Sequence, residues 1–139
     1  MDNTEKYSHW EDIASYDLGT AEAMFDSGRY LYVVFMCQQA IEKLSKGLYV
    51  YYTNLEATRT HNINIVLSPL FQEGSALHAE ISTFKNLYAP FFAELLAYYI
   101  SERYPSYKER LSSAIGPEQA NSVLQRTKEA FKWLQSQKK

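Results

Sequence analysis

Apolar residues recur at three- and four-residue spacing over more than twenty residues, and this pattern limits the possible fold more than any other feature of the chain. The stripe runs from about Tyr30 to Tyr52 and comprises Tyr30, Val33, Cys37, Ile41, Leu44, Leu48 and Tyr51. Such spacing predicts a long amphipathic helix. The chain has only 5 Gly and 4 Pro among 139 residues, which favours long helices over a many-turned β fold.

Similar patterns on either side predict further helices. The first spans Trp10 to Phe25, and Gly28 follows as its C-cap because glycine takes the left-handed conformation without penalty. A short helix is expected at Ile63–Leu70, with Thr60 or His61 near its start.

The C-terminal half contains signals for three more helical stretches. The first covers about Leu77 to Tyr88, and Pro90 fits either a first-turn position or a kink before the second, Phe91–Arg103. Pro105 should stop that second helix. Gly116-Pro117-Glu118 marks the start of the last helix. Its predicted core face consists of Ala120, Val123, Leu124, Thr127, Phe131 and Leu134.

These elements predict an all-α fold: an up-and-down bundle of about five helices with two long antiparallel central helices. A chain of 139 residues is large enough to bury a core of its own, so residues 1–139 are interpreted as a single domain.

Net charge, cysteine content and hydrophobicity limit the kinds of partner and compartment that we expect for this chain. With 14 basic and 16 acidic residues the net charge is −2, which argues against bulk electrostatic capture of nucleic acid but allows a local basic patch. The single cysteine, Cys37, is interpreted as a buried thiol in a reducing compartment. The apolar region Leu87–Ile100 is too short to span a bilayer. We therefore expect a cytoplasmic protein with no membrane contact.

No metal or cofactor is predicted. The three histidines, His9, His61 and His78, lack metal-ligand spacing, and neither a glycine-rich phosphate loop nor a Ser-His-Asp order is visible. His61 is interpreted as a residue at a helix start.

Four motifs in order carry a family resemblance. They are Ser27-Gly28-Arg29-Tyr30, Gln38-Gln39-Ala40-Ile41-Glu42-Lys43, Thr60-His61-Asn62-Ile63 and Tyr99-Ile100-Ser101-Glu102-Arg103-Tyr104-Pro105. Together they resemble the HEPN family of small helical domains found with nucleotidyltransferases in prokaryotes. The resemblance implies a bundle like the substrate-binding subunits of those enzymes, a homodimer, and a toxin–antitoxin context.

In active members of that family, four to six intervening residues separate an arginine in this position from a histidine, and the pair forms a metal-independent ribonuclease site. Arg103 matches the arginine, but Lys108, Glu109 and Arg110 occupy the places where the histidine would follow. Lysine and arginine stabilise charge but are poor proton shuttles at neutral pH. No catalytic residue is therefore assigned, and the chain is expected to bind rather than to cleave.

The candidate residues for binding a nucleotide or RNA surround that arginine. They are Arg103, Tyr104, Tyr107, Lys108 and Arg110, together with Glu42, which is similar to an acidic position that assists the arginine in related domains. Cations and aromatic rings together suit phosphates and bases. Structural alternatives remain open: Arg103 could cap its own helix, Lys108 and Arg110 could be solvated, and Glu42 could form an ordinary surface pair with Lys46.

Three functions follow from these residues and the resemblance. The first is a nucleotide- or RNA-binding module that pairs with a separately encoded minimal nucleotidyltransferase. The second is a metal-independent endoribonuclease with an altered site that depends on Arg103. As a separate alternative to its helix-start role, His61 could supply the missing imidazole from elsewhere in the fold. The third is a purely structural helical dimer.

Overall fold

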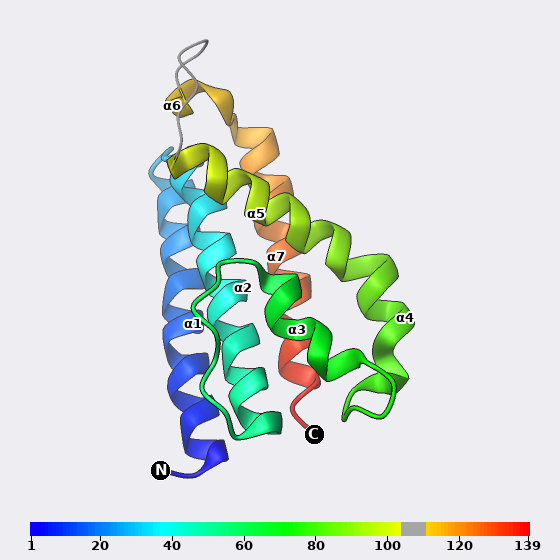
Figure 1. The fold of residues 1–139 in the computed structure, drawn as a ribbon. Helices are drawn as coiled ribbons and strands as arrows, with labels where there is room; N and C mark the ends of the chain where they lie inside the picture. Colours follow the sequence, from blue (N-terminus) through cyan, green and yellow to red (C-terminus); the bar gives the residue numbers. More distant parts are fainter. Residues whose placement is uncertain (104–110) are drawn as a thin grey trace.

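Two antiparallel helices of 24 residues each open the bundle. The computed structural model describes the backbone of residues 1–103 and 111–139 and the side chains of residues 1–100 and 113–139. Helix α1 (Asn3–Asp26) starts earlier than predicted, because the Asp2 side chain accepts a hydrogen bond from the Glu5 N–H at 2.8 Å and caps it. Helix α2 (Tyr30–Thr53) lies beside α1 with opposite direction (Figure 1).

The turn between α1 and α2 has the predicted glycine C-cap. Gly28 has a φ of +73°, and its N–H donates to the Phe25 carbonyl at 3.0 Å. The Arg29 N–H donates to the Met24 carbonyl at 2.8 Å, which completes a Schellman motif. These two hydrogen bonds satisfy carbonyl groups at the end of α1, and the chain reverses direction within three residues.

After α2, the segment 54–62 runs back along α2 before helix α3 (Ile63–Phe71) begins (Figure 1). The N-cap of α3 is Asn62, whose Oδ1 accepts from the Asn64 and Ile65 N–H groups at 3.1 and 3.3 Å. Thr60 and His61 lie near the helix start, as predicted, but neither is the cap.

The next helical run is continuous from His78 to Arg103 but changes its geometry along the way. A 3-10 turn η1 (His78–Glu80) leads into α4 (Ile81–Thr83), a π turn η2 (Phe84–Tyr88) and α5 (Ala89–Arg103). The Ala89 N–H donates to the Phe84 carbonyl, five residues back. Pro90 has no N–H and its ring crowds the preceding turn, which explains the wider turn just before it. Of the two predicted alternatives, Pro90 takes the first-turn position of α5, and the π turn before it keeps the helical run continuous.

The chain ends with a short helix α6 (Leu111–Ala114) and the long α7 (Pro117–Ser136), which has proline in its first turn as predicted. Among the described residues, helices of nine or more residues number five, namely α1, α2, α3, α5 and α7. The predicted all-α bundle of about five helices is therefore confirmed.

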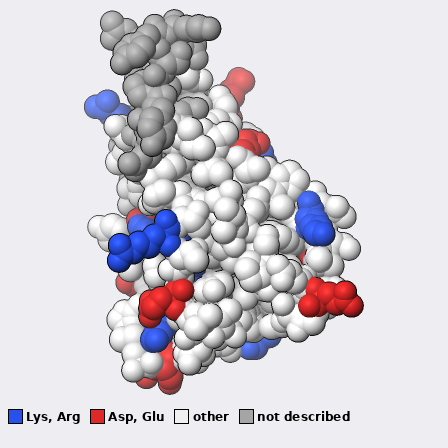
Figure 2. Space-filling view, in the orientation of Figure 1, with Lys and Arg blue, Asp and Glu red and all other residues white. Residues whose placement is uncertain are grey.

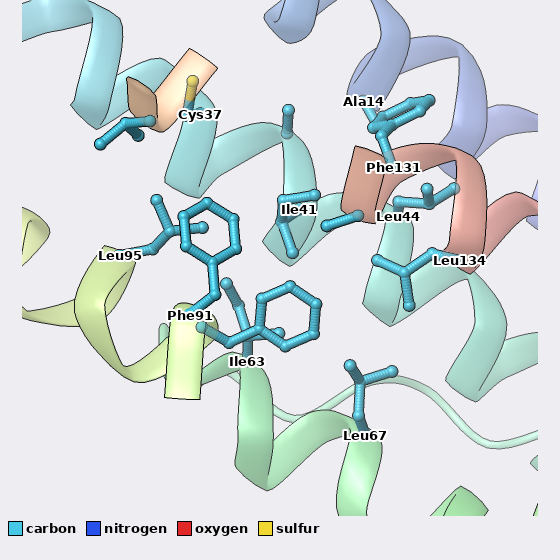
Figure 3. Packing of buried hydrophobic residues seen from close by; sticks show 14 of the residues in the cluster. Ala14, Cys37, Ile41, Leu44, Ile63, Leu67, Phe91, Leu95, Phe131 and Leu134 are labelled. Atoms are coloured by element: carbon cyan, nitrogen blue, oxygen red, sulfur yellow. The ribbon is translucent and has the colours of Figure 1, made fainter. Parts of the chain in front are cut away.

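Helix α2 is the centre of the bundle and contacts α1, α3, α5 and α7. Figure 3 shows side chains from all five helices converging on it, among them Ala14, Ile41, Ile63, Leu95 and Phe131. The predicted stripe is buried at Val33, Cys37, Ile41, Leu44 and Leu48, and the predicted core face of α7 is buried throughout.

The surface over α3 and α5 carries few charged side chains in the view of Figure 2. Within the described part of the chain, no helix is both long and apolar enough to cross a membrane.

Candidate functional site

A buried carboxylate lies in the middle of α2 and organises a polar cluster around itself. The side chain of Glu42 is only 6% exposed. Its Oε2 accepts from the Lys46 ammonium at 3.0 Å, and its Oε1 accepts from the Gln38 amide at 3.0 Å. All three residues lie on one face of α2 at four-residue spacing. A buried ion requires such partners, because an unpaired charge inside a protein is very costly.

The fourth member of the cluster, His61, comes from the segment that returns along α2. Its Nδ1 lies 2.9 Å from Glu42 Oε1, and its backbone carbonyl accepts from Gln38 Nε2 at 2.9 Å. The Gln38 side chain therefore holds both the carboxylate and the His61 backbone. The His61 side chain remains 50% exposed, so it connects the buried carboxylate to the protein surface.

Aromatic rings fix the plane of that imidazole. The ring of Tyr99 in α5 lies 4.6 Å from the His61 ring at an interplanar angle of 34°. Tyr99 also stacks on Phe35 of α2 with a centroid distance of 5.4 Å. Three segments far apart in sequence, α2, the loop before α3, and α5, thus meet at one surface point.

Helix α5 contains both Tyr99, which contacts His61, and Arg103, the first of the predicted binding residues. Arg103 is the last residue of α5, four residues beyond Tyr99, so its backbone lies about one helical turn past the His61–Tyr99 contact. The side chain of Arg103 lies outside the described part of the structure, as do Tyr104, Tyr107, Lys108 and Arg110. Of the six predicted site residues, the structure therefore describes the side chain of Glu42 alone.

The surface-pair interpretation of Glu42 and Lys46 is wrong in one respect. The pair forms, but both residues are buried, with 4% and 9% of their surfaces exposed. Part of the physical reason is that His61, from the returning segment 54–62, lies against this face of α2 at Gln38 and Glu42. The four-residue spacing reveals the pair but cannot reveal what packs over it.

Sequence reasoning missed the roles of Gln38 and Tyr99. The sequence predicts a helix-start residue at His61, and the structure shows that its side chain also reaches back to Glu42 of α2. The signal was present, because Gln38, His61 and Tyr99 each belong to one of the four family motifs. Nothing in their spacing indicates that these motifs meet in space.

A second ion pair links α5 to α7 away from this cluster. Arg126 donates two hydrogen bonds to the Glu94 carboxylate, at 2.9 and 2.8 Å, and its guanidinium lies 4.8 Å from the centre of the Phe91 ring. The hydrogen bonds from Arg126 lower the pKa of Glu94. This geometry clamps two helices together, and we interpret it as structural.

Metal and thiol chemistry find no support among the described residues. No group of three or more His, Cys, Asp or Glu side chains there could hold a metal ion. Cys37 is a free, buried thiol, and burial raises its pKa to about 12, which suppresses the reactive thiolate. The predicted core role of Cys37 is thereby confirmed.

Comparisons with known proteins agree with the fold. The family model described as the HEPN domain matches residues 7–137. A crystal structure of a protein from Thermus thermophilus is similar with a TM-score of 0.74 and 20% identity, covering 95% of this chain and 98% of that one.

A second crystal structure, of an archaeal HEPN homologue, has a TM-score of 0.70 and 23% identity. The similarity covers 96% of this chain and 98% of the archaeal one. No curated protein sequence matches the chain.

Proposed function

The chain belongs to the HEPN domain family, and on that premise we propose that it is a binding module for a nucleotide or RNA. Its proposed protein partner is a separately encoded minimal nucleotidyltransferase, in a context of the toxin–antitoxin kind. The proposed site is the Glu42–His61–Tyr99 cluster together with the end of α5 at Arg103.

The observation that carries this proposal is the half-exposed imidazole of His61, held by a buried carboxylate beside an aromatic ring. A fixed imidazole offers hydrogen bonds to a ligand, and a cation such as Arg103 suits a phosphate. Nucleic-acid sites commonly combine such phosphate contacts with hydrogen bonds to the sugar and base.

The segment after Arg103 supports binding over cleavage. The places where the family's histidine would follow hold Lys108, Glu109 and Arg110. Lys108 and Arg110 can attract an anion but do not readily move a proton at neutral pH.

The test is a binding titration with fluorescently labelled oligoribonucleotides and nucleoside phosphates, read by anisotropy. We expect Arg103→Ala to weaken binding about tenfold or more, because a charge-assisted contact is lost. Lys132→Ala, which removes one exposed charge from α7, is the matched control and should leave affinity unchanged. Failure of the wild-type protein to bind any of these probes would reject the module.

A second candidate function, a metal-independent endoribonuclease, is favoured by one specific contact. The bond from His61 Nδ1 to Glu42 supplies an imidazole with an orienting carboxylate, which is the arrangement that general bases use. Under this hypothesis the purified protein cleaves RNA in EDTA, and both His61→Ala and Arg103→Ala abolish cleavage. Absence of cleavage over a broad RNA panel would rule it out.

The proposed assembly is a homodimer. Light scattering should give about twice the 16.1 kDa of one chain. Co-expression with a nucleotidyltransferase encoded by a neighbouring gene should yield a complex that survives size-exclusion chromatography. A dimer that binds neither the enzyme nor any nucleotide probe would instead favour a purely structural role.

A further inference from the structure

We propose that the Nε2 atom of His61 is a fixed hydrogen-bond acceptor for a ribose 2′-hydroxyl, so that the site prefers ribonucleotides to deoxyribonucleotides. This inference rests on the proposed nucleotide-binding function and names the class of ligand that the site selects. Glu42, Gln38 and Tyr99 contact His61 directly, and Lys46 pairs with Glu42.

The first step is the tautomer of the imidazole. Glu42 Oε1 lies 2.9 Å from His61 Nδ1, and a carboxylate oxygen can only accept a hydrogen bond, so Nδ1 must carry a proton. In the neutral ring, the lone pair then belongs to Nε2. The buried carboxylate thus determines which ring nitrogen can accept a hydrogen bond from a ligand.

The second step is the charge of the cluster. The ammonium of Lys46 already neutralises the Glu42 carboxylate at 3.0 Å, and both groups are buried. Glu42 and Lys46 together therefore present no net charge to the imidazole, and Nε2 is the acceptor of its neutral form.

The third step is position. Gln38 Nε2 holds the His61 carbonyl at 2.9 Å, and the Tyr99 ring lies against the imidazole. Among the residues that the structure describes, none makes a hydrogen bond to Nε2, and half of the side chain is exposed. The acceptor is therefore both fixed in space and open to a ligand.

The fourth step is the chemistry of the ligand. Phosphate oxygens are acceptors and cannot donate to a lone pair, whereas a ribose 2′-hydroxyl is a donor that DNA lacks. A fixed acceptor that is left unpaired by a deoxyribose weakens binding relative to the ribose ligand. Loss of one neutral hydrogen bond corresponds to about a fivefold to tenfold change in affinity.

The experiment compares oligomers of equal length that differ only at the sugar. Oligouridylate is compared with oligodeoxyuridylate, and oligoadenylate with oligodeoxyadenylate, each titrated against the full chain. The wild-type protein should prefer the ribo-oligomer about fivefold to tenfold in both series. His61→Ala should remove this preference, and His61→Gln should keep part of it, because the glutamine side-chain oxygen reaches a position similar to that of Nε2.

Glu42→Gln tests the positioning role of the carboxylate. Lys46 makes a charge-assisted bond to the amide oxygen, so the amide NH₂ faces His61 and the ring proton shifts to Nε2. We expect loss of the ribose preference, together with a change of tautomer in the ¹⁵N spectrum of the His61 ring. As a control, His9→Ala removes an exposed histidine from α1 and should change neither the ribose preference nor the tautomer of the His61 ring.

The outcomes separate this inference from the proposed function. Equal binding of ribo- and deoxy-oligomers by the wild-type protein, or a preference that persists in a folded His61→Ala variant, overturns the inference alone. A preference confined to one base series shows that the sugar alone does not determine it, and also overturns the inference. Absence of binding to every probe rejects the proposed function, and the inference with it. Thermal unfolding monitored by circular dichroism establishes that each variant is folded.

Discussion

At the scale of single residues, Glu42 matters because its charge is buried and satisfied by neighbours. The carboxylate accepts hydrogen bonds from three side chains on two segments of the chain. Replacing one member of such a pair leaves the other charge buried without compensation, whereas replacing both removes the problem.

We therefore predict that replacing Glu42 alone destabilises the protein more than replacing Glu42 and Lys46 together. Glu42→Leu should lower the free energy of unfolding by about 3–5 kcal/mol, because Lys46 keeps a buried, unpaired ammonium. Glu42→Leu combined with Lys46→Met should recover much of that loss. Urea unfolding of both variants measures this, and a double variant no more stable than the single one would contradict it.

The pair between Glu94 and Arg126 predicts a pH dependence. Because Arg126 lowers the pKa of Glu94 from 4.5, the pair contributes stability above about pH 4.5 and loses it as the pH falls through the lowered folded-state pKa. Glu94→Gln should therefore be less stable than wild type at pH 7 and equally stable at strongly acid pH. The effect should be small, because both side chains are over one-third exposed. An equal difference at both pH values in urea unfolding would refute this prediction.

At the scale of helices, the close approach of α1 and α2 depends on Gly47. A Cβ atom built there would lie 2.8 Å from the Trp10 Cβ and 3.4 Å from Tyr7 Cδ2. Since a Cβ atom of α1 cannot move without its backbone, a larger residue would push the two helices apart.

Two glycine substitutions provide a matched test of that contact. Gly19→Ala has open space and should raise the free energy of unfolding by about 0.5–1 kcal/mol through helix propensity. Gly47→Ala gains the same propensity but should be destabilised by about 1–3 kcal/mol from overpacking. Chemical denaturation measures the free energy of unfolding of both variants. Stabilisation by both substitutions would show that the contact of α1 with α2 does not require glycine at position 47.

Most helices could be predicted from the sequence, because spacing and capping are local. Gly28 and Pro117 identify helix boundaries by their own backbone chemistry, and both predictions are confirmed. The π turn before Pro90 could not be predicted, since proline explains a lost hydrogen bond but not how the helix absorbs it. The contact of His61 with Glu42 depends on the path of the loop 54–62, which no periodicity encodes.

At the scale of the whole molecule, the low net charge restricts how nucleic acid can bind. The chain has a net charge of −2, and the proposed binding segment has three cations, Arg103, Lys108 and Arg110. Each phosphate that a single strand exchanges for a cation contributes about −0.7 to the slope of log affinity against log salt.

We therefore expect a slope no steeper than about −2 for RNA binding to one subunit. Titrations between low and physiological salt measure it directly. A slope twice as steep would contradict a site with three cations and would require a wider basic surface than one segment supplies.

The π turn Phe84–Tyr88 takes up one extra residue within a single turn of the helix. Deleting one residue from it, for example the exposed Leu87, would return the turn to α-helical spacing while α5 keeps its rotational phase relative to α4. Tyr99 should then stay against His61, whereas a one-residue deletion within α5 before Tyr99 would rotate Tyr99 by about 100° away from it.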